Sequence, residues 1–334
     1  MKLRLLFDVG RAYPTPSRLK AAAGSWLAYR RSLLRGKAWQ PLYPPVLMVE
    51  PTNLCNLRCP LCPSGNGNLK RPRGMMGMAL FRQLINEVYR QIGMLILWNQ
   101  GEPFLHPGIW QMINTAVQRD MYVLTSTNFS MPIDLQRILD SGLHHLIVSM
   151  DGISGATYDQ YRVNGDFELV MRNMRDLVQL RGRRRHPYVI WQFIVMKHNE
   201  HEVAEVKRLA KAIGVDRLEF KTAQIYHPED MPRFLPQDGS FSRYHIENGE
   251  YRIKAELLNR CHRLWMQPVV NWDGELAVCC YDKDLSLPIG NVRDKGFGAL
   301  WFGDRINAIR QQILSDRKVY PICRNCGEGI SRRV

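Results

Sequence analysis

The sequence lacks the features of a membrane-spanning or exported protein. No apolar run reaches the roughly 18 residues that a helix needs to cross a bilayer. Lys2 and Arg4 begin the chain, but the apolar stretch beside them is too short for a signal peptide and is interrupted by Asp8. We find no nucleic-acid-binding motif, and no nucleic-acid partner is expected. The sequence therefore predicts a globular, cytoplasmic protein.

Acidic residues are scarce relative to basic ones. The chain has 46 Lys and Arg against 31 Asp and Glu, a formal net charge of +15. An excess of this size suggests an anionic partner, although solvated basic faces would account for much of it. Eight cysteines without an export signal favour metal ligation over disulfide bonds. This usage fits a reducing cytoplasm.

Acids are almost absent from the N-terminal region. Between Met1 and Gln40 there are nine Lys or Arg and one acid, Asp8. Residues 17–37 have helix-forming character, with Leu and Trp interleaved with basic residues. Such a helix could dock the protein on an anionic membrane surface at the inner face of the membrane. A basic helix packed on the domain behind it is an equally open alternative, and residues 1–44 are assigned to a basic N-terminal extension.

After the extension, strand-like and helix-like stretches alternate. Six apolar, β-branched or aromatic runs predict strands: Val46–Glu50, Met94–Trp98, Tyr122–Ser126, Leu146–Met150, Tyr188–Val195 and Arg217–Lys221. The helical patterns between them are Ala79–Ile92, Ile109–Arg119, Asp134–Ser141, Phe167–Arg181 and Glu200–Ile213. Alternation of this kind predicts an α/β fold with a parallel sheet covered by helices.

The alternation ends near Tyr226. A hairpin is predicted at 271–275 and a helix at 297–314, in a region that also contains five cysteines. We therefore divide the remaining chain into a core of residues 45–235 and a smaller C-terminal module of residues 236–334.

Three cysteines, Cys55, Cys59 and Cys62, form a CxxxCxxC loop directly after the first predicted strand. Thiolates hold iron–sulfur clusters, and a four-iron cluster with three protein ligands leaves one iron open. The alternatives are a zinc site short of one ligand or a chance cluster of buried thiols. The loop resembles that of the radical S-adenosylmethionine (radical SAM) superfamily. This resemblance implies a partial (βα)6 TIM-like barrel and a [4Fe–4S] cluster whose open iron binds S-adenosylmethionine.

Further residues near predicted strand ends match that superfamily. Asn99-Gln100-Gly101-Glu102-Pro103 resembles the GGEP motif that binds the methionine amino group, with Gln100 departing from the pattern. The resemblance implies that Ser149 binds the ribose hydroxyls and that Arg162 binds the methionine carboxylate. The remaining expected cofactor contacts are Asn128, Asp151 and Asn199. A helix cap for Ser149, Asp151 or Asn199 and a surface ion pair for Arg162 are the alternatives.

A second cysteine set lies near the C-terminus. Cys261, Cys279, Cys323 and Cys326 follow one another at spacings of 18, 44 and 3 residues. The set resembles the SPASM/Twitch extension, in the shorter Twitch form of the aminocyclitol dehydrogenase of butirosin biosynthesis. The resemblance implies one auxiliary [4Fe–4S] cluster, hence two clusters in all, with a zinc site as the alternative.

Cys280 is left over from this set. Adjacent strand residues point to opposite faces, so Cys279 and Cys280 cannot easily both ligate one cluster. Cys280 is then an inert buried thiol or a catalytic hydrogen-atom donor, and the choice of ligand between the two cysteines stays open.

The resemblance implies reductive cleavage of S-adenosylmethionine to a 5′-deoxyadenosyl radical, which abstracts hydrogen from a substrate. We expect a two-electron oxidation of a sugar-like or cyclitol-like alcohol, with an anionic or glycan-related small molecule as substrate. An external one-electron reductant such as flavodoxin or ferredoxin is also expected. Three alternatives stay open: modification of a ribosomal peptide, epimerisation that uses Cys280, and a non-catalytic iron–sulfur electron carrier.

Overall fold

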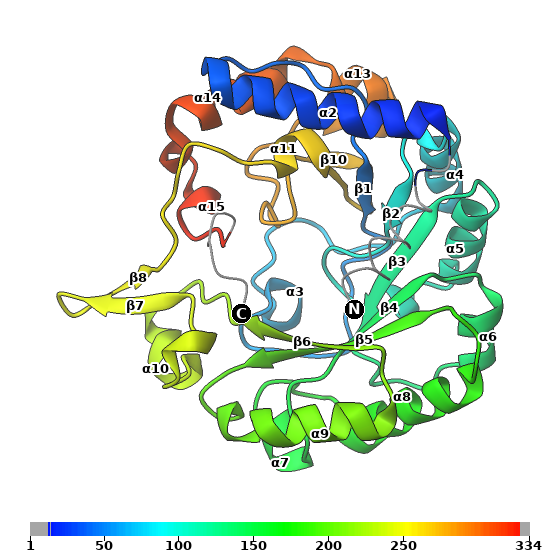
Figure 1. The fold of residues 1–334 in the computed structure, drawn as a ribbon, viewed down its shortest axis with the longest axis vertical. Coiled ribbons are helices and arrows are strands. Elements are labelled where there is room, and N and C mark those ends of the chain that lie inside the picture. Colours follow the sequence, from blue (N-terminus) through cyan, green and yellow to red (C-terminus); the bar gives the residue numbers. More distant parts are fainter. Residues whose placement is uncertain (1–12, 14, 328–334) are drawn as a thin grey trace.

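A nine-stranded, mostly parallel sheet organises the computed structural model, which describes residues 13 and 15–327 (Figure 1). Lys2, Arg4, Asp8 and Arg11, and with them the expectation about an N-terminal signal, lie outside the described residues. Six neighbouring parallel strands form the centre: β1 (Val46–Val49), β2 (Met94–Ile96), β3 (Tyr122–Thr127), β4 (His145–Ser149), β5 (Tyr188–Val195) and β6 (Arg217–Thr222). The predicted α/β fold with a curved (βα)6 sheet is confirmed.

Five helices lie along the outer side of this sheet in Figure 1: α4 (Met78–Val88), α5 (Ile109–Val117), α6 (Leu135–Asp140), α8 (Phe167–Arg181) and α9 (Val203–Ile213). Each presents an apolar stripe to the sheet; in α8, Val170, Met174 and Leu177 are buried. The predicted limits of β5 and α8 match the structure. Asp166 caps α8 by accepting a hydrogen bond from the backbone of Leu169, which explains the sharp start.

The basic extension forms helix α2 (Pro16–Arg35), which packs on the domain behind it. Thr15 caps its N-terminus, and Gly36 ends it in the left-handed conformation with φ of 62°. The alternative of a packed helix is therefore confirmed for one face of α2. No helix in the described part of the chain is long and apolar enough to cross a membrane.

The C-terminal module continues the same sheet. Strand β9 (Val269–Val270) pairs in parallel with β1, and β10 (Glu275–Ala277) folds back antiparallel on β9, which confirms the predicted hairpin. Strand β11 (Gly290–Asn291) completes the edge. The shorter helices of the chain are α3 (Pro63–Asn66), α7 (Gly155–Tyr158), α10 (Met231–Phe234), α11 (Arg263–Met266), α12 (Val292–Lys295) and α15 (Pro321–Arg324).

Two features of this region differ from expectation. The single helix predicted over 297–314 is wrong: the segment forms α13 (Phe297–Trp301) and α14 (Asp304–Asp316), because the extended backbone of Gly303 interrupts the helix. A hairpin of β7 (Tyr244–Glu247) and β8 (Glu250–Ile253) was not predicted. The proposed boundaries at 44/45 and 235/236 remain predictions.

Candidate active site

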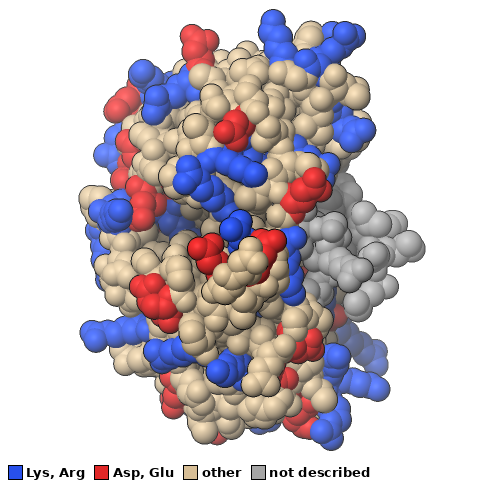
Figure 2. Space-filling model, turned by 90° about the vertical axis from the view of Figure 1, so that its left-hand side faces the viewer, with Lys and Arg blue, Asp and Glu red and all other residues tan. Residues whose placement is uncertain are grey.

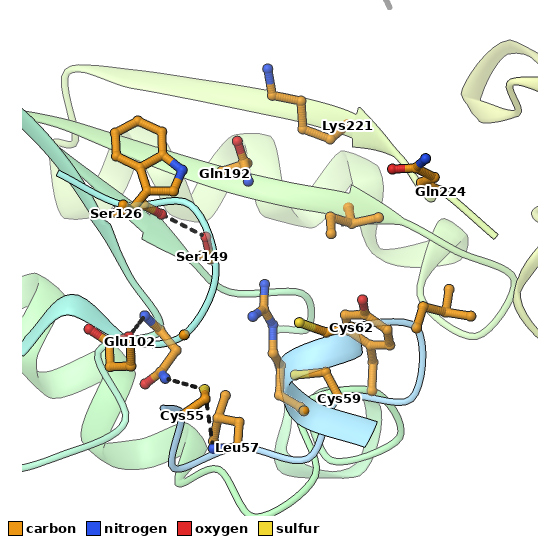
Figure 3. A pocket seen from close by; sticks show the side chains of 18 of the residues that line it. Cys55, Leu57, Cys59, Cys62, Glu102, Ser126, Ser149, Gln192, Lys221 and Gln224 are labelled. Atoms are coloured by element: carbon orange, nitrogen blue, oxygen red, sulfur yellow. Dashed lines mark hydrogen bonds between the residues drawn. The ribbon is translucent and has the colours of Figure 1, made fainter. Parts of the chain in front are cut away.

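The loop after β1 carries Cys55, Cys59 and Cys62 into one cavity of about 400 Å³ (Figure 3). The pKa of Cys55 is raised to about 12 and that of Cys59 to about 11, mainly by burial, and the neighbouring thiols contribute to both shifts. A Cβ added at Gly65 would lie 2.7 Å from the backbone nitrogen of Cys59, so glycine is needed where α3 folds against the loop. The three thiols are thus held as a group.

Gly101 and Glu102 lie directly against this loop. Gly101 has φ of +76°, and a Cβ there would come within 2.5 Å of the Leu54 carbonyl oxygen. The two oxygens of Glu102 accept hydrogen bonds from the backbone of Phe104 and Asn128, at 3.1 and 2.7 Å. Burial raises the pKa of Glu102 to about 7. Glu102 therefore joins the end of β2 to the end of β3 at the wall of the cavity.

Asn128 and Ser149 follow from β3 and β4. The Asn128 amide donates to Asn56 Oδ1 at 2.8 Å and to Cys55 Sγ at 3.8 Å, so it supports the cysteine loop from the side. The hydroxyl of Ser149 lies 3.4 Å from that of Ser126, as Figure 3 shows. Both serines line the cavity at the carboxyl ends of their strands, the edge where α/β barrels place functional groups.

Arg162 reaches the cavity because a buried carboxylate holds it there. Its Nε and Nη2 contact Asp151 Oδ2 at 2.7 and 2.6 Å, and Asp151 Oδ1 accepts from the backbone of Ile194. The side-chain amide of Asn199 donates to the carbonyl oxygens of Asp151 and Ile194 and accepts from the backbone nitrogen of Met196. Asp151, Asn199 and Pro103 do not appear among the described residues that line the cavity. The structure places Asp151 and Asn199 behind Arg162.

Basic side chains that the sequence did not single out complete the cavity. Lys221, Arg243 and Lys283 line it together with Arg162, and Glu102 is the one acid among its described lining residues. Lys221 and Gln192 lie across the cavity from the cysteine loop (Figure 3). Lys221 could have been found as a polar residue at a strand end. Arg243 and Lys283 follow the core strands in sequence, and no local signal marks them.

The second cysteine set also gathers in space. The pKa of the Cys279 thiol is raised by burial and further by the nearby thiols of Cys280, Cys261 and Cys326. Burial raises the pKa of Cys323 to about 11, with Cys326 adding to the effect. In the described part of the chain, no three His, Cys, Asp or Glu side chains are arranged to hold a single metal ion. Four gathered thiols suit a cluster, whose ligands bind separate irons.

Cys280 faces a different environment from Cys279. Strand β10 ends at Ala277, so Cys279 and Cys280 lie after the strand and not within it. Their side chains nevertheless pack in different places: Cys279 against the main core, and Cys280 against the apolar cluster that includes Met48 and Ile96. Cys280 lines a neighbouring cavity of about 430 Å³ and lies 3.6 Å from Arg263 Nη1. This second cavity shares Trp98, Asn99, Gln224 and Lys283 with the first.

Comparisons with known proteins agree with this arrangement. The model of the radical SAM superfamily matches residues 49–212, and that of the SPASM iron–sulfur cluster-binding domain matches residues 261–327. A tungsten-containing aldehyde ferredoxin oxidoreductase cofactor-modifying protein of Pyrococcus furiosus is 24% identical over 84% of this chain and 86% of its own length. The mycofactocin maturase MftC of Mycobacterium ulcerans is 27% identical over 85% and 80%.

A solved structure has the same fold. BtrN in complex with AdoMet and 2-DOIA covers 86% of this chain and 94% of its own, with a TM-score of 0.55 and 16% identity. A pre-heme d1 synthase of Dinoroseobacter shibae is matched over 42% of its own length.

Proposed function

The chain belongs to the radical SAM superfamily and carries a SPASM domain, and from this premise we propose that it oxidises a sugar-like or cyclitol-like alcohol that bears an anionic group. The reaction removes two hydrogens from the alcohol and leaves a carbonyl. S-adenosylmethionine and a [4Fe–4S] cluster, when bound, supply radical chemistry able to break an unactivated carbon–hydrogen bond. An external one-electron reductant such as flavodoxin or ferredoxin would supply the electron that starts the cleavage of S-adenosylmethionine, and the second electron of the alcohol would pass to the auxiliary cluster.

The described residues fit two clusters. Cys55, Cys59 and Cys62 would hold the first, with Gly101, Glu102, Asn128, Ser149 and Arg162 beside it for the cofactor. Cys261, Cys279, Cys323 and Cys326 would hold the second. An auxiliary cluster with four thiolate ligands suits an oxidation, because the substrate must give up a second electron after it loses a hydrogen atom.

The observation that carries the proposal is the charge of the cavity. Arg243 donates from Nε and Nη2 to the Oγ1 and carbonyl oxygen of Thr222, both at 3.0 Å, which fixes the guanidinium at the end of β6. Its Nη1 is buried and has no hydrogen-bond partner within the described chain. Lys283 lies nearby, 4.9 Å from the ring centre of Tyr226. A buried guanidinium nitrogen without a hydrogen-bond partner is costly unless an acceptor approaches it, and the phosphate of a phosphorylated or nucleotide-linked sugar supplies one.

The experiment is anaerobic turnover of the reconstituted protein with candidate phosphorylated and unphosphorylated sugars and cyclitols. We expect 5′-deoxyadenosine to accumulate with a product two mass units lighter than the substrate. Arg243→Gln should raise KM for the phosphorylated substrate, whereas Arg252→Gln, on the exposed β8, should not. A failure to form any 5′-deoxyadenosine with reductant present would favour a non-catalytic electron carrier.

Epimerisation is a second candidate, favoured by the position of Cys280. A thiol in the cavity that adjoins the first could return a hydrogen atom to the opposite face of the substrate carbon. Turnover in deuterated water distinguishes the two reactions. Oxidation leaves a carbonyl without deuterium at that carbon, and Cys280→Ala stays active. Epimerisation gives deuterium at that carbon, product of unchanged mass in ordinary water, and an inactive Cys280→Ala.

Peptide modification is a third candidate, since a maturase matches most of the chain. Its distinguishing outcome is 5′-deoxyadenosine formation that requires a peptide substrate and is insensitive to Arg243→Gln.

A further inference from the structure

The outward face of helix α2 carries large apolar and basic side chains, whereas a surface helix ordinarily turns its large apolar side chains inward. Apart from Arg18, the residues that α2 buries have small side chains: Ala21, Ser25, Ala28 and Ser32. Four of its large apolar side chains are exposed instead, among them Leu27 at 58% and Leu34 at 79%, whereas Tyr29 packs against the core. A surface helix ordinarily turns such residues toward the core. Packing on the domain therefore does not explain why they are there.

The exposed apolar residues share one side of the helix. Leu19, Trp26, Leu27 and Leu34 recur at intervals of seven, one and seven residues, which places them on one face of an α-helix. That face is opposite the buried stripe. Trp39 and Leu42, in the segment that follows α2, are also exposed. These six make up more than half of the eleven exposed large hydrophobic residues in the described chain, so they form a patch rather than scattered single residues.

Contacts on the inner side hold α2 in this orientation. The Arg18 guanidinium donates to the carbonyl oxygens of Tyr89, Arg119 and Asp120, at the ends of α4 and α5. Ser25 donates to the carbonyl oxygens of Leu42 and Tyr43, at 3.0 and 2.9 Å. The helix lies along the outer edge of the molecule, opposite α7 and α9 (Figure 1). These contacts turn the apolar face outward.

The charges carried by α2 and the segment that follows it have one sign. Residues 16–40 contain Lys20, Arg30, Arg31, Arg35 and Lys37 besides Arg18, and no acid. On the face drawn in Figure 2, by contrast, basic side chains are interspersed with acidic ones. Leu and Trp side chains flanked by cations along one helix are the features of a helix that lies in a membrane interface. Lysines and arginines attract anionic headgroups, while Trp favours the boundary between headgroups and acyl chains.

We propose that the outward face of α2, with Trp39 and Leu42, docks the enzyme on the surface of an anionic lipid bilayer. The apolar side chains enter the interface and the basic side chains contact the headgroups. This docking is independent of the reaction that the cavity carries out.

The test is flotation of the full-length, reconstituted protein with vesicles of phosphatidylcholine alone or mixed with phosphatidylglycerol. We expect binding to the mixed vesicles that weakens as salt rises, because exposed charges are screened over about 10 Å at 0.1 M salt. Leu27→Gln with Leu34→Gln should lower the partition coefficient by about tenfold or more, since it depends on buried apolar area. Arg30→Gln with Arg35→Gln should lower it by about fivefold per residue.

Matched controls remove the same groups elsewhere. Leu180→Gln with Ile246→Gln changes residues that are 48% and 63% exposed, and Arg208→Gln with Arg252→Gln removes two exposed charges. Both pairs should bind vesicles like the parent protein.

Three outcomes would overturn the proposal. The first is an absence of flotation, and the second is an equal loss of binding in the controls. The third is a concentration-dependent dimer that Leu27→Gln with Leu34→Gln disrupts, which would mean that a second copy of the chain covers the face.

Discussion

Gly101 offers a direct test of how the second-strand loop supports the cysteine loop. Alanine there would meet two separate costs. A non-glycine residue in the left-handed region costs about 1–2 kcal/mol. The added Cβ would also lie 2.5–2.7 Å from backbone atoms of Leu54, Asn53 and Thr52, and relieving such overpacking costs about 1–3 kcal/mol more. We therefore expect Gly101→Ala to lose about 2–5 kcal/mol of unfolding free energy.

Gly36 supplies the control. Its φ of +62° is similar, but a Cβ there would meet nothing within 4 Å, so Gly36→Ala should lose about 1–2 kcal/mol, the backbone cost alone. Urea unfolding of the cluster-free protein measures both variants. Gly101→Ala should also bind less iron at the first cysteine loop after reconstitution. Equal stability losses in the two variants would refute the idea that the close approach, rather than the dihedral, requires glycine.

Three further predictions concern the clusters and buried charges. The reconstituted protein should hold about eight irons, and alanine at all three cysteines of the first loop should remove about half; zinc at the second set would contradict this. Asp151→Asn should release Arg162 and weaken S-adenosylmethionine binding in equilibrium dialysis, at a stability loss of about 1–3 kcal/mol; Glu205→Gln, which breaks an exposed pair, should change neither. Arg18→Met should lower the unfolding free energy by about 2 kcal/mol or more in urea, whereas Lys20→Met beside it should change it by less than about 0.5 kcal/mol.

The sequence predicted the core because runs of apolar, β-branched or aromatic residues, most continuous in β1, β2 and β5, alternate with helical patterns. It failed where burial is slight. Strands β7 and β8 are mostly exposed and only four residues long each, so their alternation of apolar and polar residues is too short to be a clear signal. The local signal was Asn248-Gly249, whose φ values of 52° and 78° are those of a tight hairpin turn. The break between α13 and α14 was missed because apolar spacing continues across Gly303.

The candidate site divides in the same way. Cys55, Gly101 and Ser149 were predictable because motif and strand end coincide in sequence. Arg243 and Lys283 were not, since they reach the cavity through long-range packing of the C-terminal region. The sequence suggested both Arg162 and Asp151 as cofactor contacts, but the structure places them differently. Arg162 lines the cavity, whereas Asp151 lies behind Arg162 and fixes the orientation of its guanidinium.

The C-terminal module is built into the core rather than appended to it. Strand β9 pairs with β1 through Met48–Val269 and Val49–Val270. Glu50, at the end of β1, accepts a buried hydrogen bond of 2.5 Å from Arg71 Nη2, and Arg71 Nε donates to the carbonyl of Lys283.

Deleting residues 236–334 would leave the edge of β1 unpaired, and it would remove the Lys283 carbonyl that accepts from Arg71 Nε. An open edge is a template for aggregation, and the loss of one acceptor from a buried donor costs about 1–3 kcal/mol. We therefore expect residues 1–235 alone to aggregate on expression, as measured by size-exclusion chromatography. A soluble monomer with cooperative unfolding would contradict this and show that the core folds without its C-terminal edge.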